Sequence, residues 1–325
     1  MKAVIVNEWC SPRDLRIEET PRPEPGDHEV LIKVEAAGLN FPDVLVIAGK
    51  YQVKPAFPFT PGLEVAGTIE RLGAGVTRFN IGERVLAQVG LGGFAEFVVA
   101  PDANVHRLPS AMSFEEGAGF GLTYQTSFFA LAYRGNLRPG ETVLVHSAAG
   151  GVGTAALQIA RGLGAGKIIG TAGSDEKRET ILANGADLAI NYQTEDFVEI
   201  VKRETGGRGA DLIYDPVGGE LGERNTKCVA FEGRIVLIGF TSGKFSSFAS
   251  NHILIKNYSV IGLHWGAYRQ SLPAKINEGW RELISLYETG SLKTVIGGVF
   301  SMEKVGDAME FLTSRKAVGK IVLKW

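Results

Sequence analysis

Short apolar runs separated by turn residues dominate the first third of the chain. The runs lie at residues 3–6, 30–34, 64–72, 84–87 and 95–99. Stretches rich in Pro, Gly and Asp interrupt them, for example residues 21–27 and 90–93. Many short strands with such turns predict a small β-barrel or β-sandwich.

From about residue 115 the pattern changes to strands that alternate with helices. Apolar, β-branched runs predict strands at residues 142–147, 167–171, 188–191, 212–215, 234–239 and 259–263. Apolar residues at helical spacing predict helices at 153–163, 175–184 and 195–204. Such alternation predicts right-handed βαβ units and a parallel sheet.

The last 50 residues alternate again. The pattern predicts an amphipathic helix at 275–288, a strand at 298–301, a helix at 305–314 and a final strand at 319–323. We expect this tail to return to the first domain. With 325 residues the chain has room for two domains at roughly 150 residues each. A β-rich domain together with a domain of alternating strands and helices makes the predicted fold class α/β.

Composition narrows the function classes. Lys and Arg number 34 against 36 Asp and Glu, a net charge of −2, and there is no polybasic run, so neither nucleic acid nor a membrane surface is an expected partner. No uncharged apolar stretch approaches the ~18 residues of a membrane span. Cys10 and Cys228 are too few for a disulfide framework or a four-thiolate zinc site, which indicates a reducing, cytoplasmic setting.

Residues 143–153 combine a strand, a glycine-rich turn and the start of a helix. Gly150, Gly151 and Gly153 allow close backbone approach, and a helix N-terminus offers N–H groups to a pyrophosphate. Ala148 stands where the first glycine of G-x-G-x-x-G would be, so a turn needed only for packing stays an alternative. A phosphate-loop ATPase motif ending at Gly166-Lys167 is excluded by Arg161 and Ile168.

The end of the second strand of this unit selects between the two nicotinamide nucleotides. NAD sites need an acidic residue there for the ribose 2′-hydroxyl, but the position is Ala172. Ser174, Lys177 and Tyr192 could instead hold a 2′-phosphate, which favours NADPH. Asp175 is the alternative, because as a displaced ribose acceptor it would restore NAD. A merely solvated first helix turn is the other alternative.

Ordered motifs along the whole chain carry a resemblance to a known family. They are Asn-Phe-Pro-Asp at 40–43, Gly-Lys-Tyr at 49–51, Pro-Gly-Leu-Glu-Val-Ala-Gly at 61–67, Gly-Glu-Arg-Val at 82–85, Gly-Leu-Thr at 121–123, the loop at 148–153, Ala-Gly-Ser at 172–174 with Lys177, Asn191-Tyr192, Asp-Pro-Val-Gly at 215–218 and Gly-Lys-Ile-Val-Leu at 319–323. The chain thereby resembles the zinc-independent, zeta-crystallin-like quinone oxidoreductase branch of the medium-chain dehydrogenase/reductase superfamily. The resemblance implies a GroES-like domain (1–124 and 265–325), a Rossmann NADP-binding domain (125–264) and an active site in the cleft.

The residues at the metal positions differ from those of the zinc-dependent alcohol dehydrogenases that this superfamily also contains. Those enzymes have Cys where this chain has Asn40 and His where it has Leu63, which leaves Glu64 without neighbouring ligands. A four-cysteine structural loop would follow residue 87, but the cysteines are missing. We predict no metal at either position.

Without zinc there is no strong Lewis acid to ionise an alcohol, so the expected acceptor is already electron-poor. The predicted function is hydride transfer from NADPH to a quinone. The alternatives are an enone or acryloyl-thioester reductase, and an NADPH-binding protein with little catalysis, similar to a crystallin. The acceptor pocket is expected to be less polar than in relatives with Arg at the position of Ile47. Candidates to line it are Phe128, Phe240, Trp265 and Tyr268.

The resemblance also implies site residues. Tyr51 is the candidate to polarise the acceptor carbonyl or donate a proton, and Asn40 and Asp43 accompany it as candidate catalytic residues. Tyr51 as a rim aromatic, Asp43 as a helix cap and Asn40 as a turn residue stay open. The expected cofactor contacts are Asn40, Thr123, Ala149, Gly150, Gly151, Val152, Gly153, Gly173, Ser174, Lys177, Tyr192, Gly239, Phe240, Leu263 and Lys320.

The last predicted strand of the parallel sheet runs from Ser259 to Leu263. In the resembling family the matching strand pairs with a second subunit, and an apolar edge left open is an aggregation hazard. A homodimer through this edge is therefore expected.

Overall fold

The computed structural model describes residues 1–325, which form two compact units. Unit 1 comprises Met1–Leu122 and Thr294–Trp325, and unit 2 comprises Thr123–Lys293. Residues 265–293, predicted to belong to the first domain, are thus part of unit 2. The reason is packing of the helix α9 (Pro273–Glu288): a Cβ on its Gly279 would lie 3.0 Å from the ring of Phe129.

Unit 1 is built on a seven-stranded sheet with the order β14-β15-β3-β4-β5-β7, and β6 pairs with β3. A separate hairpin joins β1 and β2. The strands are β1 (Lys2–Ile5), β2 (Arg16–Glu19), β3 (Glu29–Leu39), β4 (Glu64–Leu72), β5 (Arg84–Gln88), β6 (Phe97–Pro101), β7 (Val105–Arg107), β14 (Ile296–Ser301) and β15 (Lys320–Lys324). The predicted β-rich first third and the return of the chain end are both present.

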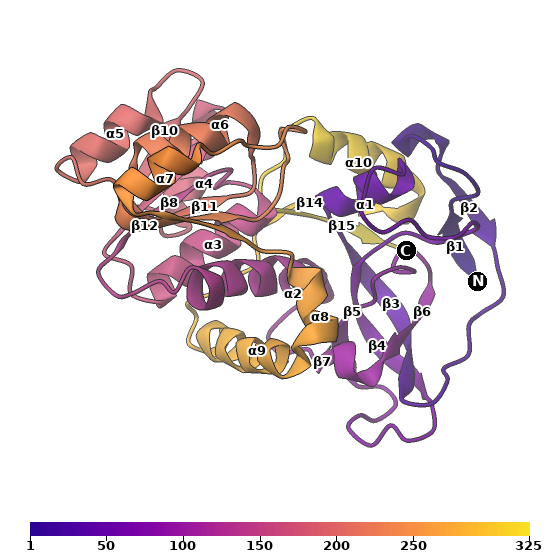
Figure 1. Ribbon diagram of the computed structural model, residues 1–325. Helices are drawn as coiled ribbons and strands as arrows, with labels where there is room; N and C mark the ends of the chain where they lie inside the picture. The colour runs from indigo at the N-terminus through magenta and orange to yellow at the C-terminus, as the bar shows by residue number, and fades with distance from the viewer. The chain divides into compact units, whose positions relative to one another are not determined.

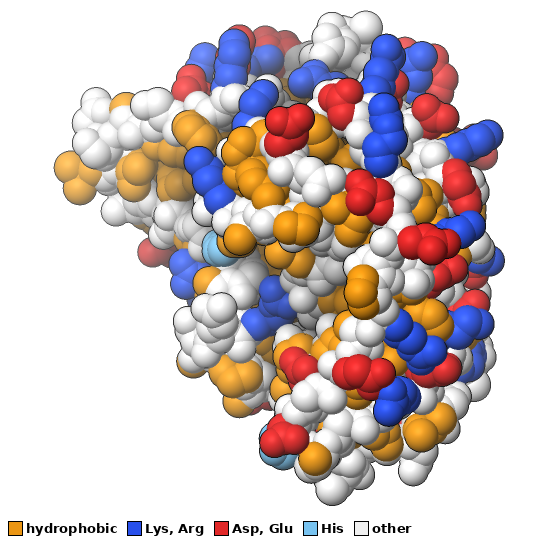
Figure 2. Space-filling model, turned by 90° about the vertical axis from the view of Figure 1, so that its right-hand side faces the viewer, with side chains coloured by type: hydrophobic (Ala, Val, Ile, Leu, Met, Phe, Trp, Pro, Cys, Tyr) orange, Lys and Arg blue, Asp and Glu red, His pale blue; other side chains and the backbone are white.

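The long strand β3 organises this unit because it pairs with three others, β4, β6 and β15. Its side chains are buried almost throughout, and Val30, Ile32 and Leu39 belong to the core. The helices α1 (Phe41–Ile47) and α10 (Val305–Thr313) lie against each other beside the sheet (Figure 1). On the face in Figure 2, Lys and Arg side chains are interspersed with Asp and Glu side chains.

Unit 2 is a doubly wound parallel sheet with the strand order β10-β9-β8-β11-β12-β13. Its strands are β8 (Thr142–Val145), β9 (Lys167–Ala172), β10 (Leu188–Asn191), β11 (Ala210–Asp215), β12 (Val229–Leu237) and β13 (Ser259–Gly262). α3 (Gly151–Gly162) covers one face, and α5 (Phe197–Glu204), α6 (Gly219–Arg224) and α7 (Ser250–Lys256) cover the other (Figure 1). The predicted parallel sheet is confirmed.

The strand order reverses between β8 and β11, and in such sheets ligands bind beyond the carboxyl ends of the strands at this point. The helices at that edge therefore position the candidate site.

The remaining helices are α2 (Phe114–Phe128), α4 (Arg178–Ala183), α8 (Trp265–Ser271), the 3-10 turns η1 (Pro12–Asp14), η2 (Asp102–Asn104), η4 (Asp175–Lys177), η5 (Asn225–Lys227) and η6 (Met302–Lys304), and the π-helical turn η3 (Phe129–Arg134). Together, η4 and α4 correspond to the helix predicted at 175–184, whereas α2 and α8 were not predicted from the sequence pattern. α2 was missed because it is buried on most sides and has no polar stripe. No helix of the chain is both long and apolar enough to cross a membrane.

Candidate functional site

The glycine loop joins β8 to α3 at the strand-order reversal. Gly150 is the N-cap of α3, in extended conformation (φ −80°, ψ 173°), and no side chain caps the helix. The preceding Ser147 has a positive φ of 50°, and the amide of Ala148 donates to the carbonyl of Thr171 at 2.9 Å. A 12-residue helix that begins without a side-chain cap suits a phosphate group.

Two glycines of this loop serve different purposes. A Cβ on Gly153 would lie 2.2 Å from the carbonyl oxygen of Ser147 and 2.7 Å from Cα of Ala148, so Gly153 permits close packing of the helix on the loop. A Cβ on Gly150 would lie 3.3 Å from both the carbonyl oxygen and the hydroxyl of Ser147. Packing therefore requires glycine much more strictly at Gly153 than at Gly150.

The carboxyl ends of β9 and β10 lie side by side beyond this loop, since these two strands pair. A Cβ on Gly173 would lie 2.9 Å from the hydroxyl of Tyr192, so this aromatic ring closes over the glycine. Ser174 is the N-cap of η4, and Lys177 ends that turn. Lys177 is half-buried, and desolvation lowers the pKa of its ammonium. Three of the residues predicted to hold a 2′-phosphate thus come from two adjacent strand ends.

Asp175, the alternative ribose ligand, has other partners. Its carboxylate accepts a hydrogen bond from Nε of Arg178 at 2.7 Å. This bond, together with one from Asn191, holds the pKa of Asp175 below its ordinary value. Arg178 in turn donates to the carbonyl of Ala189 at 2.6 Å. The geometry favours a structural role for Asp175 over ribose binding.

Unit 1 contains a buried polar cluster at the start of α1. The backbone N–H of Asn40 donates to Oδ2 of Asp43 at 2.8 Å. Asp43 thus caps the start of α1, which is the alternative role that the sequence analysis left open for it. Asp43 is only 1% exposed. Desolvation raises the pKa of its carboxyl to about 7, although hydrogen bonds from the amides of Asn40 and Gly62 and the charge of Lys320 act in the opposite direction.

Two members of this cluster were not predicted to interact. The ammonium of Lys320 donates to the carbonyl of Leu39 at 3.0 Å, to Oδ1 of Asn40 at 2.7 Å and to Oε1 of Glu64 at 2.9 Å. The other carboxylate oxygen of Glu64 accepts from the amide of Leu122 at 2.7 Å. Lys320 and Glu64 are 4% and 2% exposed. All three N–H bonds of the ammonium are therefore used within the protein.

The other predicted residues are distributed over both units. Tyr51 is half-buried and packs against the core of unit 1, in the loop after α1. Thr123 is buried on α2, and Leu263 is buried just after β13. Gly239 and Phe240 follow β12, at the same edge of the parallel sheet as the glycine loop.

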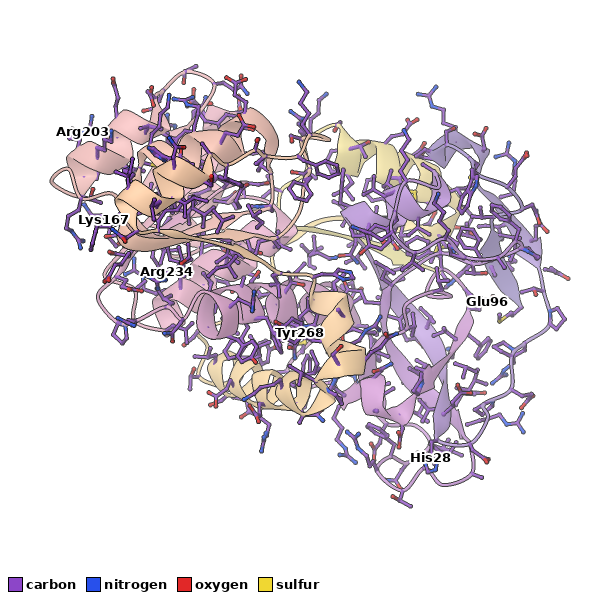
Figure 3. The ribbon with its side chains drawn as sticks, viewed as in Figure 1. His28, Glu96, Lys167, Arg203, Arg234 and Tyr268 are labelled. Atoms are coloured by element: carbon purple, nitrogen blue, oxygen red, sulfur yellow. The ribbon has the colours of Figure 1, made fainter.

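The aromatic residues proposed for the acceptor pocket fall into separate contacts. Phe240 meets Phe245 edge-on with ring centroids 4.8 Å apart. Phe128 and Tyr268 both contact Phe129, with centroids 6.5 Å and 5.0 Å apart, and Figure 3 shows Tyr268 on α8. A groove of about 490 Å³ runs along this second group, lined by Phe128, Phe129, Tyr133, Lys275, Glu278, Gly279, Arg281 and Glu282.

Sequence reasoning also missed a buried hydrogen-bond chain below the glycine loop. His146 contacts the hydroxyl of Thr171 at 2.8 Å and Oδ1 of Asn225 at 2.7 Å, and Asn225 donates to Asp215 at 3.2 Å. Burial lowers the pKa of His146, which keeps it neutral, and this fits a ring that accepts from Thr171 and donates to Asn225. This chain of hydrogen bonds connects the ends of β8, β9 and β11. Its only signal in the sequence was a polar residue at or near the end of each of these predicted strands.

Comparisons with known proteins match both units. The family model described as "Alcohol dehydrogenase GroES-like domain" matches residues 26–110, and that described as "Zinc-binding dehydrogenase" matches residues 151–287. The Bos taurus protein "Quinone oxidoreductase-like protein 2" is 38% identical over 96% of this chain and 89% of its own length. The chain belongs to the quinone oxidoreductase family of medium-chain dehydrogenases/reductases.

Solved structures of this family have the same fold. Escherichia coli quinone oxidoreductase, solved in complex with NADPH, is similar with a TM-score of 0.93 and 31% identity over 100% of both chains. The CurK enoyl reductase is similar with a TM-score of 0.91 and 31% identity over 99% of this chain and 98% of its own. Family membership makes unit 1 a GroES-like domain and unit 2 a Rossmann domain, and the chain is an oxidoreductase.

The position at which the sequence analysis considered a zinc ion lies in the buried polar cluster of unit 1. The His, Cys, Asp and Glu side chains of the protein form no group of three that could hold a metal ion. Glu64, the acidic residue at the position discussed for zinc, is engaged by Lys320 and Asn40. In this chain the acidic residue at that position is thus part of an internal ion pair.

Proposed function

We propose that this protein is an NADPH-dependent reductase that transfers hydride to a quinone or a similar electron-poor acceptor without a metal. The observation that carries the proposal is the start of α3 at Gly150, which no side chain caps. At the neighbouring end of β9, Asp175 accepts a hydrogen bond from Arg178, which disfavours its use as a ribose ligand. The solved complex of the Escherichia coli relative with NADPH supports this choice of nucleotide. When bound, the nucleotide supplies the hydride, and the protein supplies binding and orientation.

The binding roles follow the geometry of unit 2. The backbone from Ala149 to Gly153, including Gly151 and Val152, would hold the pyrophosphate at the helix N-terminus. Ser174, Lys177 and Tyr192 would donate to the 2′-phosphate, and the lack of a Cβ on Gly173 lets the Tyr192 hydroxyl lie close to this strand end. A phosphate beside Lys177 would favour the charged form of its ammonium, which desolvation disfavours.

Tyr51 is our candidate to polarise the acceptor carbonyl, because its phenol hydroxyl is a hydrogen-bond donor. Thr123, Gly239, Phe240 and Leu263 are proposed to contact the nicotinamide half of the nucleotide. Asp43 accepts a hydrogen bond from the backbone N–H of Asn40. It is therefore proposed to position Asn40 and not to contact the acceptor.

A second candidate function is reduction of a C=C bond conjugated to a carbonyl, which the likeness to the CurK enoyl reductase favours. The test is NADPH oxidation by chelator-treated protein with 1,4-benzoquinone, compared with acryloyl-CoA at the same concentration. We expect faster turnover with the quinone, unchanged by the chelator. Faster turnover with the thioester would overturn the choice of acceptor, and tight NADPH binding without any turnover would support a binding protein with little catalysis.

We also propose a homodimer through β13, the outermost strand of the parallel sheet. Exposed apolar side chains lie on the elements before β13 in the chain: Leu254 and Ile255 on α7 are 76% and 74% exposed, and Phe231 on β12, which pairs with β13, is 70% exposed. Exposed apolar side chains of this kind, together with an unpaired strand edge, support an interface.

Replacement of both Leu254 and Ile255 by Glu is expected to convert the dimer into a monomer in sedimentation equilibrium, because charges would be buried unpaired at the interface. Leu182→Glu is the matched control, since Leu182 is an exposed apolar residue on α4 near the opposite edge of the sheet. A wild-type protein that sediments as a monomer, or a double variant that stays dimeric, would contradict this assembly.

A cytoplasmic location is proposed with this function, because Cys10 and Cys228 are both free thiols. Recovery of the protein in a membrane or secreted fraction would contradict it.

A further inference from the structure

The hydrogen-bond chain buried in unit 2 has no role in the function proposed so far. It joins four side chains that have no exposed surface, namely Thr171, His146, Asn225 and Asp215. The distances between successive members are 2.8, 2.7 and 3.2 Å. Buried hydrogen bonds add little net stability over an apolar core of the same shape, but a fully satisfied network fixes one arrangement of the groups that it joins.

The carboxylate of Asp215 sets the direction of the bonds in this chain. Its Oδ1 accepts from two backbone amides of the following turn at 2.8 and 3.0 Å, and its Oδ2 accepts from Nδ2 of Asn225. Since a carboxylate only accepts, Oδ1 of Asn225 is left to face Nε2 of His146, and this nitrogen must donate. In the neutral ring Nδ1 then accepts, so the hydroxyl of Thr171 is the donor.

The Thr171 end of the chain holds a strained residue at the start of the glycine loop. Ser147 has a φ of 50°, in the left-handed region that residues other than glycine rarely adopt. Its two neighbours in sequence are both bound to Thr171, because the ring of His146 contacts the hydroxyl and the amide of Ala148 donates to the carbonyl at 2.9 Å. Such a conformation persists only where the surroundings impose it.

Ser147 in turn determines where α3 begins. Its carbonyl oxygen accepts from the amide of Gly150, the N-cap of the helix, at 2.9 Å. The helix packs against the same oxygen at Gly153, where there is no room for a Cβ. A rotation of the Ser147 peptide would break both contacts and would displace the backbone N–H groups at the start of α3.

We propose that Thr171 and His146 are positioning residues that hold Ser147 in its left-handed conformation and thereby place the start of α3 for the pyrophosphate. This inference rests on the proposed function, because it needs a nucleotide at the glycine loop. All the residues involved lie in unit 2. Both side chains are fully buried, so they act through the backbone and do not themselves contact the nucleotide.

The test is Thr171→Val, which removes the hydroxyl and keeps the branched shape. Two ligands without a nicotinamide ring are titrated by calorimetry: 2′-AMP, which carries the 2′-phosphate alone, and 2′-phospho-ADP-ribose, which also carries the pyrophosphate. We expect the affinity for 2′-phospho-ADP-ribose to fall about fivefold or more, because the loop that meets the pyrophosphate is no longer held. The affinity for 2′-AMP is expected to stay within about twofold of wild type.

Two further variants are matched controls. Thr171→Ser keeps the hydroxyl and is expected to restore both affinities to within about twofold of wild type. Thr142→Val removes the hydroxyl of another buried threonine, which lies at the opposite end of β8 from His146. This change is expected to leave the ratio of the two affinities unchanged, whatever it does to thermal stability.

A measurement on the wild-type protein does not depend on the folding of any variant. The Nε2 proton of His146 is followed by NMR of ¹⁵N-labelled protein. Because linkage is reciprocal, a ligand whose binding the hydrogen-bond chain favours must also stabilise that chain. Exchange of this proton with solvent is therefore expected to slow about fivefold or more when 2′-phospho-ADP-ribose binds, and to stay unchanged with 2′-AMP.

Four results would overturn the inference: equal loss of both affinities in Thr171→Val, wild-type affinities in that variant, a Thr171→Ser variant that binds as weakly as Thr171→Val, or ring-proton exchange that 2′-phospho-ADP-ribose does not slow. If Thr171→Val does not fold, the exchange measurement decides. Failure of the proposed function is distinguishable from these results, because wild-type protein would then bind neither ligand.

Discussion

The substitution Gly150→Ala is expected to weaken NADPH binding at least tenfold, a loss of about 1.4 kcal/mol in binding free energy. The unfolding temperature is expected to stay within about 2 °C of wild type. A Cβ at this position would meet the carbonyl oxygen and hydroxyl of Ser147 at 3.3 Å, so these neighbours must give by only a few tenths of an ångström, and the backbone φ of −80° suits alanine. The added methyl group would, however, occupy the surface that a pyrophosphate must approach closely.

Alanine at Gly153 is the matched comparison in the same loop, with the opposite expectation. Its Cβ would meet the carbonyl oxygen of Ser147 at 2.2 Å, so backbone must move. Overpacking of this kind costs about 1–3 kcal/mol, which lowers the unfolding temperature by several degrees. Calorimetry and nucleotide titration of both variants separate the two roles. Wild-type NADPH affinity in Gly150→Ala would contradict the assignment of this loop to the nucleotide.

The substitution Asp43→Asn is expected to remove a large pH dependence of the free energy of unfolding. Burial raises the folded pKa of Asp43 from 3.8 to about 7. Between these values the folded state binds a proton that the unfolded state has released, so the free energy of unfolding falls as the pH rises from about 4 to about 7. At 1.36 kcal/mol for each pKa unit, the total is at most about 4 kcal/mol.

The measurement is urea unfolding of wild type and Asp43→Asn at pH 4.5, 6 and 8. His106 acts in the opposite direction, because burial lowers its pKa to about 4 and favours the folded state as the pH rises to about 6.5. His106 is present in both proteins, so its contribution cancels in their difference. We expect wild type to lose stability relative to the variant as the pH rises. A difference independent of pH would show that Asp43 is ionised throughout.

Local patterns in the sequence were sufficient to predict the parallel sheet and the glycine loop. The strands of unit 2 are short apolar runs that follow one another closely, and the glycine-rich turn proposed to bind phosphate lies within eleven residues of sequence. α2 could not be predicted in this way, because a helix buried on most sides shows no periodic polar face.

The Asn40 cluster was beyond sequence reasoning for a different reason. Lys320 and Glu64 meet only because β15 and β4 both pair with β3, and no local pattern encodes that register. The boundary of the second unit was similarly determined by packing, since α9 is amphipathic and its sequence does not say which domain it covers. Family resemblance supplied Tyr51, Asn40 and Lys320 as candidates, and the geometry of unit 1 assigns the last two to each other.

The most direct test of an NADPH-dependent reductase is a fluorescence titration of the wild-type protein and of Lys177→Met with NADPH and NADH. We expect wild type to bind NADPH at least tenfold more tightly than NADH, a difference of about 1.4 kcal/mol. The Lys177→Met variant should lose most of that preference with unchanged NADH affinity, because only NADPH carries the 2′-phosphate. Equal or tighter NADH binding by the wild type would contradict the 2′-phosphate site and return Asp175 to the ribose, and binding of neither nucleotide would contradict the enzyme assignment as a whole.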